Sequence, residues 1–215
     1  MRHVAVLARA PSSGGKTRLT EGLDDARARA LRSALLSDTL HAVASVDAPC
    51  TVFVTPPEAV AEVEALAGPG TAVVPQGEGD LGRRMHAAIE HLFASGAGQV
   101  VLVGSDLPSL PPSRLVDAFD GLAAGHDLIL GPAEDGGYYL IGLARPQPWL
   151  FEGIGWGGSD VFRRTLDAAA RVGTRPLLID PWYDVDTQPD LRQVIESAAP
   201  AVRTRAWFVG QPSIG

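Results

Sequence analysis

The chain has 215 residues, a length that suits one α/β domain able to bury a full hydrophobic core. Its 18 basic and 25 acidic residues give a net charge of −7 without any run of Lys or Arg, so nucleic acid and anionic membranes are poor partners. The longest apolar stretches have strand length and the N-terminus lacks a signal-peptide pattern, so we expect a cytoplasmic protein. A single cysteine, Cys50, excludes an internal disulfide and a thiolate metal site.

The hydrophobic pattern predicts strands and helices in alternation along the chain. Strands are expected at 3–8, 50–54, 71–75, 100–103, 126–130, 140–143 and 175–179, and helices at 25–46, 57–67, 81–93, 112–124, 160–172 and after 187. Thr55, Asp80 and Thr187 are expected to cap the helices that follow them. The tail from Ala201 fits either a strand or a partner-binding segment. No repeat or linker divides the chain, so we expect a single domain over residues 1–215.

A loop rich in small and basic residues follows the first strand. It reads Arg9-Ala10-Pro11-Ser12-Ser13-Gly14-Gly15-Lys16-Thr17-Arg18-Leu19. The two glycines expose backbone N–H groups, and Lys16 and Arg18 add charge, which favours a polyphosphate site over a solvated hairpin. Residues 10–17 also fit a loose P-loop pattern, with Ala in place of the first Gly. That pattern requires a helix at the lysine, whereas helical periodicity starts only at Asp25, so a P-loop kinase is disfavoured.

The segment from Val100 to Pro108 has the pattern of a central strand that stops abruptly. Four apolar residues indicate burial on both faces of a parallel sheet, and Ser105 and Asp106 follow at its carboxyl end. That edge is where open α/β sheets bind ligands. A carboxylate in a half-buried crevice needs a cation, so Asp106 is a candidate metal ligand. The equal alternative is that Asp106 only caps the turn into the next helix.

Several further loops are expected at the same edge. In the Gly-rich turn 76–83, Gln76 could read a nucleobase and Arg83 could contact phosphate, although an Asp80 cap explains most of the pattern. Residues 131–139 predict a hairpin that also lines the pocket. The Gly-rich segment 153–158 predicts a wall or lid over an acceptor site. In 184–186, two aspartates alternate on an extended segment, so their side chains share a face.

Four motifs together resemble one protein family. They are Arg9-Ala10-Pro11 with Gly15-Lys16-Thr17-Arg18-Leu19, Gly104-Ser105-Asp106-Leu107-Pro108, Gly131-Pro132-Ala133-Glu134-Asp135-Gly136-Gly137-Tyr138-Tyr139, and Asp184-Val185-Asp186-Thr187. Over residues 3–198 the chain resembles the radical-SAM/selenodomain-associated transferases, and more distantly 2-phospho-L-lactate guanylyltransferase and the molybdenum-cofactor guanylyltransferases. The resemblance implies an α/β fold of the GT-A (nucleotide-diphospho-sugar transferase) type, three-layer α/β/α with a mixed, mainly parallel central sheet.

The resemblance also implies a site, in which Lys16 and Arg18 belong to the phosphate-binding loop and Asp106 and Asp186 hold Mg²⁺ or Mn²⁺. Lys16, Arg18 and Asp106 would then be the catalytic residues. Together with the loop patterns above, we expect nucleotide contacts at Ala8, Arg9, Ala10, Gly14, Gly15, Lys16, Arg18, Gln76, Asp80, Arg83 and Ser105, and acceptor contacts at Glu134, Asp135, Gly136, Gly137, Tyr138 and Trp156. The doubled glycine before Lys16 departs from the family pattern and leaves the loop geometry open.

These observations favour nucleotidyl transfer. A phosphate or carboxylate of a small acceptor would attack the α-phosphate of a nucleoside triphosphate and release pyrophosphate, with no general base because the nucleophile is already anionic. The alternatives are a glycosyltransferase with a nucleotide-sugar donor and Glu134 or Asp135 as base, a P-loop kinase, and a non-catalytic nucleotide-binding or scaffold protein. The basic loop favours a triphosphate over a nucleotide-sugar. The sequence leaves open the nucleobase, the acceptor and whether a homodimer forms.

Overall fold

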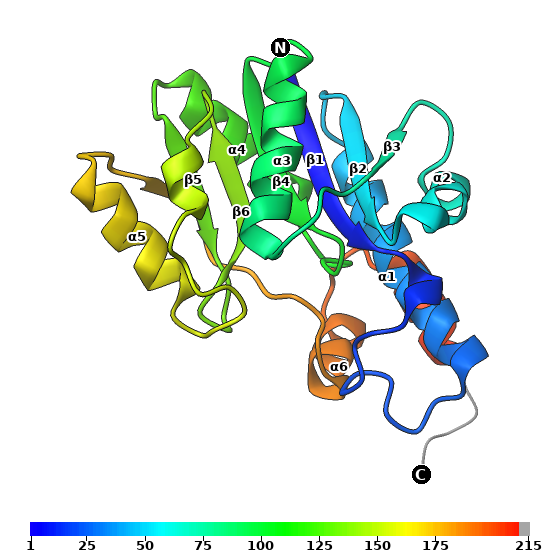
Figure 1. Cartoon of the computed structure of the whole chain (residues 1–215). Coiled ribbons are helices and arrows are strands. Elements are labelled where there is room, and N and C mark those ends of the chain that lie inside the picture. The colour runs from blue at the N-terminus through cyan, green and yellow to red at the C-terminus, as the bar shows by residue number, and fades with distance from the viewer. Residues whose placement is uncertain (211–215) are drawn as a thin grey trace.

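The computed structural model describes residues 1–210, which form three layers, α/β/α (Figure 1). The strands within this range are β1 (Arg2–Arg9), β2 (Cys50–Thr55), β3 (Ala72–Pro75), β4 (Gln99–Gly104), β5 (Leu128–Pro132), β6 (Tyr138–Leu143) and β7 (Leu177–Leu178). They form one sheet in the order β3-β2-β1-β4-β6-β5-β7, in which β6 is antiparallel to its two neighbours and the other pairs are parallel. The mixed, mainly parallel sheet expected from the sequence is confirmed.

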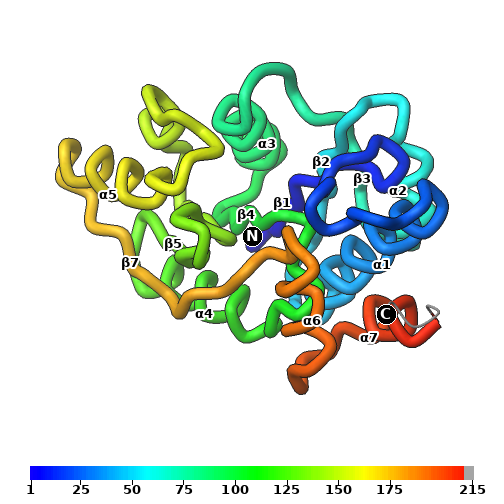
Figure 2. Tube along the Cα trace, turned by 90° about the horizontal axis from the view of Figure 1, so that it is seen from below, coloured from blue at the N-terminus to red at the C-terminus, as the bar shows by residue number. Residues whose placement is uncertain are grey.

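Helices cover both faces of this sheet. They are α1 (Asp25–Ala44), α2 (Val60–Ala67), α3 (Leu81–Ala94), α4 (Pro112–Ala123), α5 (Val161–Arg171), α6 (Gln188–Glu196) and α7 (Val202–Val209), with short 3-10 helices η1 (Pro11–Ser13), η2 (Pro57–Ala59) and η3 (Pro148–Phe151). Figure 2 shows α3 and α5 on one side of the strands and α1 and α4 on the other. Among the described residues, no helix has the length and apolar character needed to span a bilayer.

The central strands are apolar throughout because both of their faces are buried. In β4, Val101 and Val103 pack with residues of α1 and α4, whereas Val100 and Leu102 pack with residues of α3. Successive strand residues point to opposite faces, so a strand with helices on both sides has no polar face. The prediction that this segment is the centre of the sheet is confirmed.

The parallel pairing brings the predicted functional loops to one edge of the sheet. Strand β1 pairs in parallel with β2 and with β4, so the loops after Arg9 and Gly104 leave the sheet at the same end. The hairpin expected at 131–139 is also confirmed, since β5 and β6 pair antiparallel and the N–H of Ala133 donates to the carbonyl of Gly137.

The helix-cap predictions have different outcomes. Asp80 accepts a backbone N–H at the start of α3, and Thr187 forms a capping box with Asp190 at the start of α6, so both predictions are confirmed. The cap predicted at Thr55 is wrong, because Thr55 is the last residue of β2 and the following 3-10 helix begins at Pro57 without a side-chain cap. The prolines that suggested a helix entry there do begin η2, which leads into α2.

The described part of the tail is a helix, so the expectation of a strand there is wrong. Helix α7 packs along α1 and is capped by a residue of that helix, Asp38, whose carboxylate accepts from the N–H groups of Arg203 at 3.0 Å and Thr204 at 2.8 Å. Asp38 is buried within α1, which is why its carboxylate needs these partners. The part of the tail at 211–215 lies outside the described residues.

Replacing Asp38 by Asn should destabilise the protein by about 1 to 3 kcal/mol. Asn has nearly the same volume, but its side chain has only one acceptor oxygen. In the native protein the N–H groups of Arg203 and Thr204 each donate to a different carboxylate oxygen of Asp38. The midpoint of urea unfolding measures the loss. The matched control is Asp47→Asn, an exposed carboxylate after the same helix, which should leave the midpoint unchanged. Equal midpoints for the two variants would contradict the capping role.

Candidate active site

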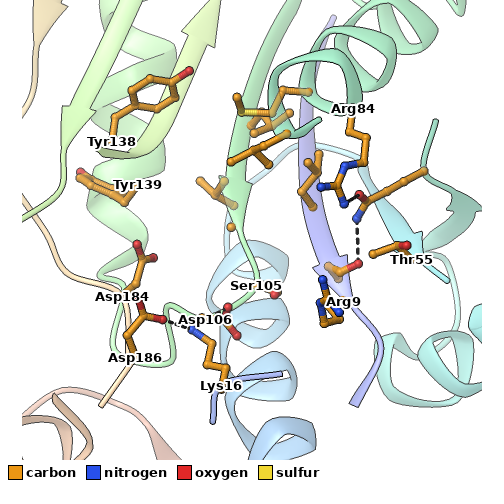
Figure 3. A pocket seen from close by; sticks show the side chains of 18 residues that line it. Arg9, Lys16, Thr55, Arg84, Ser105, Asp106, Tyr138, Tyr139, Asp184 and Asp186 are labelled. Atoms are coloured by element: carbon orange, nitrogen blue, oxygen red, sulfur yellow. Dashed lines mark hydrogen bonds and ion pairs between the residues drawn. The ribbon is translucent and has the colours of Figure 1, made fainter. Parts of the chain in front are cut away.

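A cavity of about 340 Å³ opens at the carboxyl ends of β1 and β4 (Figure 3). Its walls come from β1, β2, β4, β6, helix α3, the Gly-rich loop after β1 and the segment between β7 and α6. Of the residues expected at the site from the sequence, those that line this cavity are Ala8, Arg9, Lys16, Gln76, Ser105, Asp106, Tyr138 and Asp186. The structure therefore brings together members of the predicted phosphate loop and the predicted metal pair.

Lys16 joins the two aspartates predicted to lie together. Its Nζ is 2.9 Å from Oδ2 of Asp106 and also donates a hydrogen bond to Oδ1 of Asp186 (Figure 3). The side chain of Lys16 is only 15% exposed, and burial alone would lower its pKa, but the two carboxylates raise the pKa above its usual value. The backbone fixes the same arrangement, since Val185 N–H donates to the carbonyl oxygen of Asp106 at 2.9 Å.

The doubled glycine shapes the loop that carries Lys16. Gly14, Gly15 and Lys16 have φ angles of 75°, 89° and 55°, three consecutive residues in the left-handed region. Glycine adopts this conformation freely, whereas for lysine it costs about 1 kcal/mol or more. A Cβ at Gly15 would lie 3.3 Å from Cδ of Arg9, so the second glycine also leaves room for the Arg9 side chain. The ion pairs of Lys16 hold its backbone in this conformation.

A buried threonine supports the Asp106 loop from behind. The hydroxyl of Thr39, on α1, accepts from the N–H of Leu107 at 3.0 Å and lies 3.0 Å from the carbonyl oxygens of both Leu35 and Ser105, its acceptors. Thr39 is fully buried, so these are the polar partners that satisfy its hydroxyl. Through its contacts with Ser105 and Leu107, Thr39 fixes the backbone on both sides of Asp106. The sequence reasoning did not find this residue.

Asp184 is a second site residue that was not among the contacts predicted from the sequence. It lines the cavity beside Asp186, and its Oδ1 would be 3.9 Å from a Cβ at Gly104. Burial and the negative charges of Asp106, Asp186 and Asp135 raise the pKa of Asp184 to about 7, although Lys16 acts in the opposite direction. The alternation of acids at 184 and 186 was the signal that could have found it.

On the opposite wall, Arg84 takes the place expected for Arg83. Arg84 lines the cavity and lies 3.4 Å from Oε1 of Gln76, whereas Arg83 lines a separate cavity with the capping residue Asp80. Both amide hydrogens of Gln76 go to backbone carbonyls, of Ala8 at 2.8 Å and of Phe53 at 2.9 Å. Gln76 therefore joins β1 to β2 and orients Arg84, rather than presenting a free amide to a nucleobase.

The other predicted nucleotide contacts lie around the cavity rather than in it. Ala10 is fully buried in the core between the sheet and α1. Arg18 is 74% exposed, and its guanidinium is 3.9 Å from Asp186 at the rim. Gly14 and Gly15 belong to the loop described above, but neither residue lines the cavity. These contacts remain predictions.

A second cavity, of about 370 Å³, adjoins the first and contains most of the predicted acceptor residues. Leu81, Met85, Tyr138 and Asp184 line both cavities. The residues expected from the sequence that line the second one are Asp135, Gly137, Tyr138 and Trp156, whereas Glu134 and Gly136 do not. Glu134 is exposed, and Gly136 packs against the backbone of Ser159, where a Cβ would lie 2.0 Å from the carbonyl oxygen.

The indole of Trp156 forms one wall of this second cavity, as the Gly-rich segment predicts. It stacks on Phe151 with ring centroids 6.3 Å apart and meets Tyr138 edge to face at 6.4 Å. It also lies on the first turn of α3, where a Cβ at Gly82 would be 2.1 Å from its Nε1. Gly82 is therefore the residue that lets the indole approach the helix.

The carboxylate oxygens of the first cavity suit a divalent cation. Within residues 1–210, no group of three or more His, Cys, Asp or Glu side chains is arranged as a complete metal cage. Mg²⁺, however, is commonly held by one or two carboxylates together with substrate phosphates. Asp106 and Asp186 provide such a pair, and Asp184 lines the same cavity. The donor set therefore fits Mg²⁺ or Mn²⁺.

Comparisons with known proteins place this site in a family. A family model described as an uncharacterized protein conserved in bacteria, DUF2064, matches residues 39–158. Phosphoenolpyruvate guanylyltransferase of Geodermatophilus obscurus is 36% identical over 186 residues, which cover 82% of this chain and 80% of that protein. The chain belongs to the DUF2064 family. The matched range of the family model includes Asp106 and Trp156, whereas Lys16 and Asp186 lie outside it.

A further sequence relative and a solved structure are similar to this DUF2064 protein. The 3-phospho-D-glycerate guanylyltransferase of Phenylobacterium zucineum is 32% identical over 176 residues, 78% of this chain and 77% of that protein. A crystal structure from Desulfovibrio desulfuricans G20, described provisionally as a nucleotide-diphospho-sugar transferase, is 30% identical with a TM-score of 0.85, covering 95% of this chain and 94% of that chain. The expected GT-A-type fold is confirmed, and the DUF2064 protein is a transferase. The narrower radical-SAM-associated grouping stays a prediction.

Replacing Gly82 by Ala should displace Trp156 from its place on α3. The Gly-rich segment that carries the indole can shift, so we expect the indole to move into solvent and its fluorescence emission to move to longer wavelength. The measurement is the difference in emission between Gly82→Ala and the double variant Gly82→Ala/Trp156→Phe. The control is Gly155→Ala, where the nearest atom to a new Cβ is 4.0 Å away. An unchanged Trp156 emission in Gly82→Ala would contradict this packing.

Proposed function

We propose that this chain transfers a nucleoside monophosphate, with GTP as donor, to a small phosphate-bearing acceptor and releases pyrophosphate. The observation that carries the proposal is that Arg9, Lys16 and Arg84 line one cavity together with the carboxylates of Asp106 and Asp186. Such a set can meet both a triphosphate and the cation that accompanies it. The choice of guanine rests on the names of the two curated relatives, both guanylyltransferases.

The reaction assigned to these residues is an in-line displacement. An oxygen of the acceptor phosphate forms a bond to the α-phosphorus of GTP while the bond from that phosphorus to the pyrophosphate oxygen breaks. The nucleophile is already anionic, so the chain must position the reactants and offset charge rather than remove a proton. Lys16 keeps its positive charge because its carboxylate partners raise its pKa, and it would stabilise charge at the phosphates. Arg9 and Arg84 would bind the outer phosphates, with Arg18 at the rim.

Asp106 and Asp186 are the residues that would hold Mg²⁺ or Mn²⁺. The bound cation would draw charge from the phosphate oxygens and so make the α-phosphorus more reactive. The protein supplies the two carboxylates on separate loops, fixed to each other by the Val185 to Asp106 hydrogen bond. Asp184 lies beside them in the lining of the same cavity.

Glycosyl transfer from a nucleotide-sugar is the second candidate. The observation that favours it is the similarity to the Desulfovibrio desulfuricans protein, described provisionally as a nucleotide-diphospho-sugar transferase. In that case the second cavity would hold the sugar. Of the two candidate bases, Asp135 lines this cavity and Glu134 does not, so Asp135 would be the base. Measurement of pyrophosphate release from GTP, beside hydrolysis of GDP-sugars, separates the two reactions.

Replacing Asp106 by Asn should lower metal-dependent pyrophosphate release by about a hundredfold, on the order of 3 kcal/mol in the barrier, because one charge contact is lost. The measurement is kcat for GTP with an acceptor panel at varied Mg²⁺. The control is Asp120→Asn, a carboxylate that pairs with Arg2 at the far end of β1 and should leave kcat unchanged. Full activity in the Asp106 variant would remove the metal role from the proposal.

Replacing Thr39 by Val should lower kcat about tenfold, roughly 1.4 kcal/mol in the barrier, because the Asp106 loop loses its buried hydroxyl partner. Val has the same shape, so most of the fold should remain. Thr39→Ser keeps the hydroxyl and should restore kcat even though it removes a methyl group from the core. If Thr39→Val keeps its activity and Thr39→Ser loses it, then Thr39 contributes through core packing and not by positioning the Asp106 loop.

A further inference from the structure

The cavity beside Trp156 carries an unusual charge for a site that would admit a phosphorylated acid. The carboxylates of Asp135 and Asp184 line it, and among the described residues no Lys, Arg or His does. A negatively charged group entering this cavity would therefore face like charge without a protein cation to offset it.

The cations of the site lie on the other side. Arg9, Lys16 and Arg84 line the first cavity and are absent from the lining of the second. Arg163 and Arg164, on the helix α5 that begins at the lining residue Val161, do not line the second cavity and pair with Asp160 at 3.4 Å and 2.7 Å. Positive charge is thus concentrated where the triphosphate would lie, and the Trp156 side is left acidic.

Apart from Ser159 and the backbone of three glycines, the remaining residues that line the second cavity have apolar or aromatic side chains. They include Leu81 and Met85 of α3, the hairpin residue Tyr138, and Trp156, whose indole contacts Phe151 and Gly82. The face of an indole carries partial negative charge, which favours cations and C–H groups over anions. Carboxylates beside such a face accept hydrogen bonds from hydroxyl or ammonium groups.

From these observations we infer that the acceptor is a phosphate monoester of an alcohol or amino alcohol, whose uncharged or positively charged body enters the Trp156 cavity. The inference rests on the proposed function, because it gives the chemical class of the acceptor at that site. It sets this chain apart from the two curated relatives, whose names specify phosphoenolpyruvate and 3-phospho-D-glycerate, acceptors that carry a carboxylate beside the phosphate.

The first test compares acceptors that differ in the charge of the body. With GTP and Mg²⁺, kcat/KM for pyrophosphate release should be at least tenfold higher with phosphoethanolamine or glycerol 3-phosphate than with 3-phosphoglycerate or phosphoenolpyruvate. The same four compounds are then titrated by calorimetry into protein loaded with a GTP analogue that has a methylene group between the α- and β-phosphates. The first two should bind at least tenfold more tightly.

The second test changes the charge of the cavity. Asp135→Asn keeps an oxygen for the N–H of Gly137, which Asp135 now accepts at 2.9 Å, and removes one negative charge. The preference for phosphoethanolamine over 3-phosphoglycerate should fall at least threefold, with the affinity for the GTP analogue unchanged. The control is Asp167→Asn, an exposed carboxylate on α5 that pairs with Arg163 and does not line the cavity, which should leave the preference as it is.

The two tests separate this inference from the proposed function. Binding with the expected order but without pyrophosphate release would refute nucleotidyl transfer and uphold the assigned ligand class. Equal affinities, tighter binding of 3-phosphoglycerate or phosphoenolpyruvate, or no binding of any of the four compounds would overturn the inference. An unchanged preference in Asp135→Asn would also overturn it, because charge in the cavity would then not select the ligand.

Discussion

The ammonium group of Lys16 is the contact on which the site depends. It lies between Asp106 and Asp186, which come from loops far apart in the sequence, and Asp184 adds a third carboxylate beside them. Partly buried carboxylates repel one another and lose hydration, so they remain together only where a cation and hydrogen bonds offset that cost. Lys16 supplies the cation, and its own burial is compensated by the same carboxylates, which raise its pKa. The cluster therefore depends on Lys16, because removal of its ammonium would leave the carboxylates uncompensated.

This unit is positioned by backbone contacts that lie outside the cavity. Thr39 binds the backbone on both sides of Asp106, Val185 N–H donates to the carbonyl of Asp106, and Gln76 ties the ends of β1 and β2 together beside Arg84. Each contact joins a loop to a helix, a strand or another loop, so the charged groups need little rearrangement when substrate arrives. Electrostatic stabilisation works best when the charges are already in place, since reorganisation then takes little of the available energy.

Most of the architecture could be predicted from the sequence, because apolar runs, glycines and capping residues are local signals. Asp106 could be placed at the ligand-binding edge because it follows a central strand of a parallel sheet, whereas its pairing with Asp186 came from the resemblance to a family. Arg84 was within reach as well, since it lies three residues after Leu81 on the same helical face, whereas Arg83 does not. The contacts of Thr39 and Gly82, and the cap that Asp38 provides to α7, could not be predicted. These contacts join segments that are far apart in the sequence, and local sequence patterns do not show which distant segments lie close together in space.

Charge changes sign across the site, and this fixes how a ligand can lie in it. Arg9 and Arg84 lie on one wall of the first cavity, and the Lys16 cluster lies across from them (Figure 3). Asp135 lines the second cavity, which shares Asp184 with the first. In the proposed complex, a molecule with a phosphate at one end and an uncharged or cationic body at the other would be bound favourably in only one orientation, with the phosphate toward the α-phosphate of the donor. The reverse orientation would place the phosphate against two carboxylates. Selection of acceptor and alignment of the nucleophile would thus follow from the same charge distribution, without a separate orienting contact.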